Sequence, residues 1–380
     1  MLASGAMTTR DDSLAAGSMT GTAVDRLEHR LGASWPHLTA ARQRARETRR
    51  DLAAAVAGQV PEDTSVVVFG SLARDELSHL SDIDWTLLVD GPSSPGHLAA
   101  AQALGRAVHR HGREPGREGT FGSLAFSHEL IHRIGGEDDT NSNTTRRILL
   151  LLESAPLGRR AAYERVLSNV LWRYLDEDRG LWTGSGRAKV PRFLLNDISR
   201  YWRTMLVDFA YKQRSRAGRG WALRNIKLRM SRKLIFLSGL LGCFSPVLDL
   251  GDDEVAAIFG GAAARSEEGP MRLTRHLLAV VERPPLEVVA HALLHHGGEA
   301  ALAADGAARR LFDAYDAFLA LISDDAGRRE LAEVDYEGLE GSAAFSRGRR
   351  IAGDFQAAVS EVFLHGDGPL ARLTVDHGIF

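Results

Sequence analysis

The sequence predicts an α/β (α+β) unit in the N-terminal part of the chain, followed by a mainly α-helical body. Short segments at 66–69, 83–89 and 121–134 have the β-branched or alternating apolar pattern typical of strands. After Gly135–Gly136 the apolar residues recur at helical spacing instead. The chain has 380 residues, enough for about two domains. The change of pattern therefore places the boundary between them near residue 137.

Helices are expected wherever apolar residues recur every three or four positions. The predicted organisation is a flexible tail over 1–22, a first domain over 23–137 and a helical domain over 138–380. The first domain has its helices at 23–59, with an interruption near Trp35–Pro36, and at 72–78 and 95–111. The main helices of the second domain are expected at 161–177, 191–214, 221–243, 271–282, 286–296, 300–323 and 345–363.

The composition is that of a soluble globular protein. Apolar residues make up 44% and charged residues 25% of the chain, and the formal net charge of −2 does not indicate a nucleic-acid or membrane partner. The single cysteine, Cys243, excludes an intrachain disulfide and suits a reducing compartment. The first 22 residues lack the apolar segment of a secretory signal. We therefore expect a cytoplasmic protein without a membrane partner.

Two aspartates, Asp82 and Asp84, lie two positions apart in the second predicted strand. Alternate residues of a strand share a face, so their carboxylates project together while Ile83 and Trp85 face the other way. Mg²⁺ prefers such hard oxygen ligands and completes its shell with water and substrate phosphates, and Mn²⁺ is the alternative ion. Two ions held by this pair would suit in-line phosphoryl displacement. The competing interpretation is the solvated face of an edge strand.

Gly70 and Ser71 separate the first predicted strand from the short helix after it. Glycine allows a close approach to the backbone, and the N–H groups at a helix start attract anions. The Ser71 hydroxyl adds a donor, and Arg74 lies about one turn further on. These three residues therefore predict a phosphate-binding site beside the aspartate pair.

Gly70-Ser71, ten intervening residues and Asp82-Ile83-Asp84 together resemble the signature of the DNA polymerase β-like nucleotidyltransferase superfamily. The inner pattern, GSLARDELSHLSDIDWTLL, looks most like the bacterial branch that includes the uridylyl- and adenylyltransferases of nitrogen regulation. The resemblance is specific over 66–91 and looser over 60–135. It implies a small mixed sheet, a nucleoside triphosphate held by the Gly-Ser pair and two Mg²⁺ ions bound by the aspartates.

In the superfamily a third carboxylate on a later strand helps to activate the acceptor hydroxyl. Glu129 is the acid inside the predicted strand 121–134, so it is the candidate third catalytic and metal-binding residue. Asp138 and Asp139, on the loop that follows, are alternatives, and some members work with the pair alone. Cap residues before Arg146 and Arg147 predict either a second ligand-binding helix start or only a well-capped helix.

A cationic segment occupies residues 209–248, which contain no acid. Arg224, Lys227 and Ser231 lie three and four positions apart, so they share one side of a predicted helix and are candidate nucleotide-binding residues. Lysine is a compact point donor that can reach a terminal phosphate. A solvated helix face is the alternative interpretation.

The leading hypothesis is a Mg²⁺-dependent nucleotidyltransferase. It would move a nucleoside monophosphate from a triphosphate, with ATP the first choice, to a hydroxyl on a protein, an RNA or a small molecule, and release pyrophosphate. One alternative is a catalytically silent nucleotide-binding regulatory protein. The other is a toxin-like transferase acting on RNA, which the cationic segment suggests.

Overall fold

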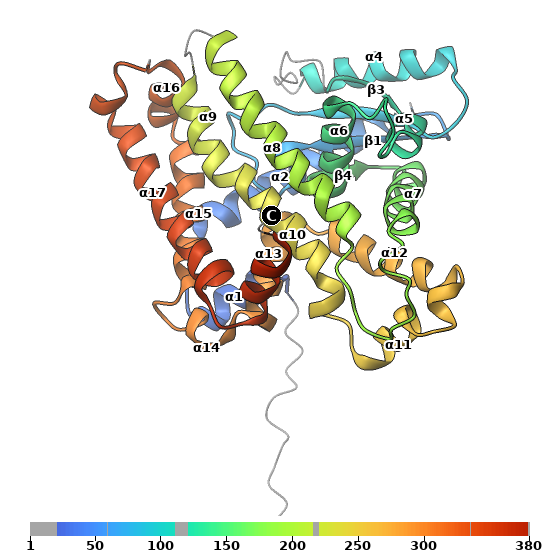
Figure 1. The fold of residues 1–380 in the computed structure, drawn as a ribbon. Coiled ribbons are helices and arrows are strands. Elements are labelled where there is room, and N and C mark those ends of the chain that lie inside the picture. The colour runs from blue at the N-terminus through green and yellow to red at the C-terminus, as the bar shows by residue number, and fades with distance from the viewer. Residues whose placement is uncertain (1–20, 59, 111–120, 216–219, 335, 379–380) are drawn as a thin grey trace, which may run out of the picture.

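The computed structural model describes residues 21–58, 60–110, 121–215, 220–334 and 336–378. It has a small four-stranded sheet near the N-terminal side and a large helical body (Figure 1). This arrangement confirms the predicted fold class. The predicted tail falls almost entirely outside the described residues.

The sheet consists of β1 (Thr64–Phe69), β2 (Trp85–Val89), β3 (Ser123–Phe126) and β4 (Ser154–Leu157), in the order β3-β2-β1-β4. β1 pairs antiparallel with β2 and β4, whereas β2 pairs parallel with β3, so the sheet is mixed. The sequence did not predict β4. Because β4 pairs with β1, the sheet extends past residue 137, where the sequence analysis places a domain boundary.

Two predicted strands have different limits in the structure. The segment predicted at 83–89 becomes a strand only at Trp85, so Asp82 and Asp84 directly precede β2. The segment predicted at 121–134 is a strand only over β3, and its second half forms helix α5 (Ser127–His132). The six residues of α5 contain two adjacent apolar side chains, Leu130 and Ile131, and fit less than two turns of helix as well as a short strand, so packing decides between them.

The helices account for most of the chain. Those that surround the sheet are α2 (Pro36–Val56), α3 (Gly70–Ala73), α4 (Pro95–Arg110), α5, α6 (Asn141–Leu152) and α7 (Ala161–Glu177). The body contains α1 (Ala23–Leu31), α8 (Arg192–Ser215), α9 (Trp221–Lys227), α10 (Lys233–Leu248), α11 (Asp252–Phe259), α12 (Glu268–Val281), α13 (Pro285–His296), α14 (Gly298–Ala301), α15 (Ala307–Ser323), α16 (Asp325–Glu333), α17 (Ala343–Ser360) and α18 (Pro369–Leu373).

Side chains alternate across the sheet and enter two different cores. Val66, Val68 and Leu87 pack against α2 and α4, whereas Val67 and Leu88 face a second core that includes α6, α7, α8 and α10. Every residue of β1 and β2 is buried. The sheet is therefore clamped between its own helices and the helical body, and its functional groups can reach solvent only where strands end.

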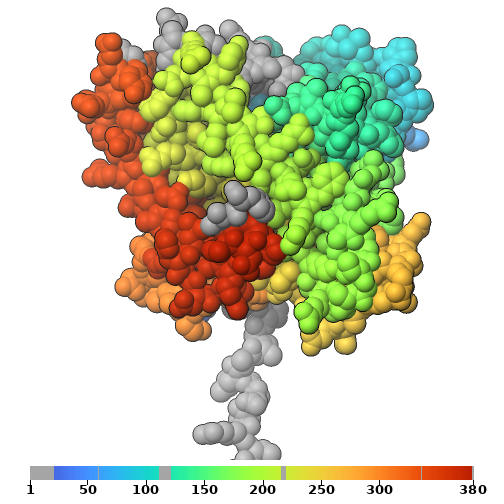
Figure 2. Space-filling model, in the orientation of Figure 1, coloured from blue at the N-terminus to red at the C-terminus, as the bar shows by residue number. Residues whose placement is uncertain are grey.

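A third core joins the first helix of the chain to the last ones. α1 and the start of α2 pack with α13, α15 and α17, so residues 23–41 belong to the helical body in space. On the face seen in Figure 2, residues of the body make up most of the surface, and α4 and α5 show at the upper right. Residues 23–41 therefore pack with the helical body, whereas the later part of α2 packs against the sheet.

One long helical rod crosses the centre of the molecule (Figure 1). It consists of α9, the π-helical turn η1 (Leu228–Arg232) and α10. Its 28 residues from Trp221 to Leu248 are long and apolar enough to span a membrane, but 72% of the most apolar window is buried inside the protein. Such burial is typical of a core helix. The π-type turn is notable because these turns often occur at functional sites.

Candidate active site

The first component of the site is the turn at the end of β1. Gly70 has a positive φ of 65°, and a Cβ at this position would lie 3.1 Å from Oδ2 of Asp84. Only glycine fits this conformation and this close approach. The turn thus brings the backbone of Gly70 and Ser71 directly against one of the two aspartates.

The second component is the aspartate pair just before β2. The amide of Phe69 donates to the carbonyl of Asp84 at 2.9 Å, so the pairing of β1 continues one step beyond the strand. Asp82 is exposed, Ile83 is fully buried and Asp84 is half-buried. This alternation indicates extended backbone with both carboxylates on the accessible side. The pair therefore projects from the end of the sheet rather than from within it.

Arg74 lies in a buried network of charges behind the turn. Its guanidinium donates to Glu76 at 3.0 Å and makes a short contact with Glu153, and Tyr315 donates to Glu76 at 2.8 Å. Burial raises the pKa of both carboxyls, and the charge of Arg74 opposes that effect. The sequence analysis assigned Arg74 to the nucleotide, but in this structure its guanidinium is engaged by two carboxylates. Glu153 and Tyr315 were missed, because neither lies near the motif in sequence.

Lys227, at the end of α9, lies within electrostatic range of the aspartate pair. Burial, followed by the charges of Arg328 and Arg232, lowers its pKa to about 8. The carboxylate of Asp82 acts in the opposite direction. The positive charges of Arg328 and Arg232, from α16 and η1, therefore act on Lys227 together with the negative charge of Asp82. This arrangement is more specific than the solvated helix face that was the alternative interpretation.

The other two residues of the predicted helical set do not join this arrangement. Ser231 is buried, and its hydroxyl donates to the Lys227 carbonyl at 3.3 Å, inside the helix. The Arg224 side chain lies against Gly220 at the start of α9. The sequence analysis did not single out Arg232, but its charge contributes to the lowered pKa of Lys227. The π-helical turn changes which residues share a side, and regular helical spacing could not predict that.

The predicted third acid is not on a strand beside the pair. Glu129 lies on α5, with its side chain 44% exposed and 3.4 Å from Arg133. β3 pairs Ser123 with Thr86 and ends at Phe126, beside Val89. Continued by the bond from the Gly122 amide to the Trp85 carbonyl, this register puts Phe121 next to Asp84. The assignment of Glu129 to that place was wrong, and an aromatic residue occupies it.

Glu129→Gln is therefore expected to leave the rate of transfer within about twofold of wild type, like other surface substitutions. The substitution preserves shape and removes only an exposed charge paired with Arg133. The measurement is kcat with saturating triphosphate and metal. A loss of about 10²-fold or more would show that Glu129 acts as a base after all.

The alternative acid Asp139 has a structural role. It is buried and accepts two hydrogen bonds from Arg147, at 2.8 and 3.1 Å. Asp197 of α8 accepts a third from Arg147 at 2.9 Å, and Tyr174 of α7 accepts one at 2.7 Å. This network fastens α6 to α7 and α8. The side chain of Arg147 thus supports the well-capped-helix interpretation rather than a ligand site.

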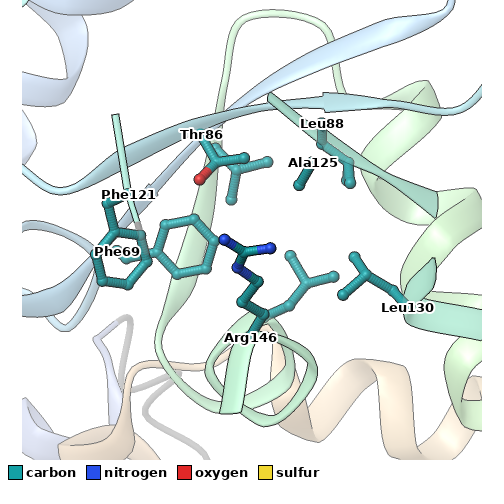
Figure 3. Close-up of a pocket in the computed structure, with 9 residues that line it drawn as sticks. Phe69, Thr86, Leu88, Phe121, Ala125, Leu130 and Arg146 are labelled. Carbon is teal, nitrogen blue, oxygen red and sulfur yellow. The ribbon is translucent and has the colours of Figure 1, made fainter. Parts of the chain in front are cut away.

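Arg146, the next residue, has a different position. Figure 3 shows its guanidinium pointing from α6 toward Phe69 and Thr86. Phe69, Thr86, Phe121 and Arg146 line a small, mainly apolar cavity on the sheet face that continues from Asp84. Its free space is about 20 Å³, close to the volume of one water molecule. The cavity extends the site toward β3, but without rearrangement it holds no nucleobase.

The donor set fits a hard divalent cation. Asp82 and Asp84 offer carboxylate oxygens, and the described residues contain no cluster of three or more histidine, cysteine or acidic side chains that could enclose a metal. Mg²⁺ commonly binds to one or two carboxylates and takes its other ligands from water and substrate phosphates. The pair is thus suited to a cation that arrives with a phosphate ligand.

The sequence comparison agrees with this geometry. Residues 49–116 match the model of the nucleotidyltransferase domain family. The matched range contains β1, α3, β2 and α4, and therefore both the Gly70–Ser71 turn and the aspartate pair. The helical body lies outside it. Comparisons with curated proteins and with solved structures give no match.

Proposed function

Because the chain carries a nucleotidyltransferase domain of the polymerase β-like kind, we propose that it transfers a nucleoside monophosphate from a nucleoside triphosphate, ATP first, to a hydroxyl group. The observation that carries this proposal is the contact of the Gly70–Ser71 turn with Asp84, with Lys227 within electrostatic range of Asp82. Pyrophosphate is the second product. The single, buried Cys243 supports a reducing cytoplasm as the location.

Each group at the site has a role in this reaction. Asp82 and Asp84 would hold Mg²⁺, or Mn²⁺ in its place, and the ion would neutralise the phosphates and orient them for in-line attack. The backbone of Gly70 and the hydroxyl of Ser71 would donate to phosphate oxygens. Lys227 would contact the outer phosphates, which become the leaving group. Arg74, buried behind the Gly70–Ser71 turn, would contribute a fixed positive charge near the phosphates.

The acceptor is best identified by labelling. The purified protein would be incubated with each α-labelled triphosphate, Mg²⁺ and cell extract, and the Asp82→Asn/Asp84→Asn variant would serve as the blank. Transfer of label to a protein, an RNA or a small molecule that is absent in the blank identifies the acceptor class. Absence of label in every fraction with all four triphosphates would contradict the proposed activity.

A silent nucleotide-binding regulator is the second candidate. The specific observation in its favour is Phe121, which occupies the position beside Asp84 where a third acid would stand. An RNA-directed transferase has weaker support, because several cations of the 209–248 segment face the interior. Lys233, for example, contacts Gln356.

Lys227→Ala is expected to weaken ATP binding by about 1.5–3 kcal/mol, the scale of a hydrogen bond to a charged group. AMP should be affected much less, since it lacks the outer phosphates. Because the Lys227 pKa is about 8, wild-type ATP affinity should also fall as the pH rises through this value, and the variant should lose that dependence. Calorimetric titrations with ATP and AMP provide the measurement.

Arg229→Ala is the matched control, because it removes a cation two positions along the same rod and on another side. It should leave ATP affinity unchanged. Equal ATP affinity in wild type and Lys227→Ala would remove Lys227 from the site. Weaker acceptor binding with intact ATP affinity would instead assign it to the acceptor.

A further inference from the structure

We propose that the chain has a second binding site, for a phosphate-bearing small molecule, in a cavity behind α3. The cavity has a volume of about 350 Å³, which is within the range of small-molecule sites. Its walls come from α2, the end of α3, the edge strand β4 and the connection between α12 and α13. Gly70, Ser71, Asp82 and Asp84 do not line this cavity, so the proposed site does not depend on the proposed transferase activity.

Four arginines line this cavity: Arg46, Arg49, Arg160 and Arg283. Two come from α2, one from the start of α7 and one from the connection after α12. The folded structure brings these four arginines to one cavity from separate parts of the chain. Arginine is favoured for phosphate recognition because its planar fork donates two parallel hydrogen bonds.

The acidic residues that line the cavity already form ion pairs with arginines. Glu153 contacts Arg74, and Asp75 pairs with Arg49 at 2.6 Å. Glu282, on the wall, accepts from Arg160 at 2.9 Å. These pairs hold the lining in place, and they leave little negative charge to repel an anion.

We call the exposed arginines Arg46 and Arg283 the mouth of the cavity. Their positive charges are less completely balanced by nearby acids than those of Arg49 and Arg160. Arg46 has a side chain that is 52% exposed, and its nearest ion-pair contact is 3.8 Å, to Asp75. Arg283 is exposed, and within the described ranges it makes no ion pair with an acid. Guanidiniums with only a long ion-pair contact, or none among the described residues, favour a ligand that carries negative charge. A phosphate at the mouth, with the rest of the molecule in the cavity, satisfies both features.

The backbone beneath this cavity is strained. Asp75 has a positive φ of 60°, which is uncommon for a residue with a side chain, and it is buried. Its ion pair with Arg49 holds it there. Strained residues tend to occur at ligand sites and switch regions. Here the strained residue follows Arg74 directly and separates the cavity from the Gly70–Ser71 turn.

Calorimetry with inorganic phosphate as the probe tests the proposal on the full chain. The variants are Arg46→Ala/Arg283→Ala, which alters the mouth of the cavity, and Ser71→Ala/Lys227→Ala, which alters the proposed nucleotide site. Arg159→Ala is the matched control, since this exposed arginine pairs with Glu62 and does not line the cavity. Circular dichroism melts check that each variant is folded, and the mouth arginines are exposed enough to be truncated safely.

We expect the mouth variant to raise the phosphate dissociation constant at least about tenfold, the loss of one or more charged hydrogen bonds. Arg159→Ala should bind phosphate like wild type, and the nucleotide-site variant should keep the phosphate binding of the cavity. Phosphate binding that is lost in the nucleotide-site variant and kept in the mouth variant would overturn the proposal. So would the absence of phosphate binding by the wild-type protein.

Discussion

Asp82→Asn and Asp84→Asn should each reduce nucleotidyl transfer by at least about 10²-fold, with little change in the fold. Substitutions that only support a metal ligand commonly cost 10–100-fold, and loss of a ligand itself should cost at least as much. Asparagine keeps the shape of the side chain and removes the charge that attracts the cation. The measurement is initial rate under saturating ATP and Mg²⁺.

The control for this pair lies at the other end of the same strand. Asp90→Asn removes a carboxylate that pairs with Arg165 at 2.8 Å, away from the Gly70 turn. It should leave the rate unchanged. Thermal melting without Mg²⁺ should show both active-site variants to be as stable as wild type, since removing one of two like charges relieves repulsion. Unchanged turnover in the double variant Asp82→Asn/Asp84→Asn would contradict an enzymatic role for the site.

Arg147→Met should destabilise the folded state by about 3–5 kcal/mol, the usual cost of breaking a buried ion pair from one side. Arg147 has no exposed surface and neutralises Asp139 and Asp197 from α6. Its removal would leave the two buried carboxylates with only the longer ion-pair contacts of Arg200, at 3.5 and 3.9 Å, and the contact between α6 and α8 would weaken. Urea unfolding followed by circular dichroism measures the difference.

A second substitution separates this charge effect from lost packing. Asp139→Asn in the Arg147→Met background should restore part of the stability, because it removes a buried negative charge. Burial raises the pKa of Asp139, but the hydrogen bonds and charge of Arg147 lower it overall. The stabilisation is therefore present above the ordinary aspartate pKa and is lost as the pH falls through the lowered value. An Arg147→Met variant as stable as wild type at neutral pH would show that the network is dispensable.

The Gly-Ser and aspartate motif was predictable because its residues lie close together in the sequence. Gly70, Ser71, Asp82 and Asp84 lie within one β-turn-β segment, and their spacing alone brings them together. The long helices were predictable for a similar reason, because each has an apolar stripe over many turns. The interruption near Trp35–Pro36 also corresponds to the break between α1 and α2.

What the sequence could not predict depends on contacts between distant segments. β4 has only four residues and contains Pro156, so it is recognisable as a strand only by its pairing with β1. Glu129 belongs to a short alternating segment whose conformation is set by the packing of Leu130. Glu153 and Tyr315 meet Arg74 and Glu76 only after the body has folded over the sheet.

The π-helical turn η1 sets the rotational phase between two halves of one rod. In a regular α-helix, residues five apart point about 140° away from each other. The wider turn of η1 holds Arg232 close enough to Lys227 for its charge to lower the Lys227 pKa, while α10 keeps its own apolar residues in the core. Deleting one residue from η1 would remove the π-type turn and return the rod to regular helical winding. The number of residues between Lys227 and Arg232 therefore decides whether these two charges lie close to each other.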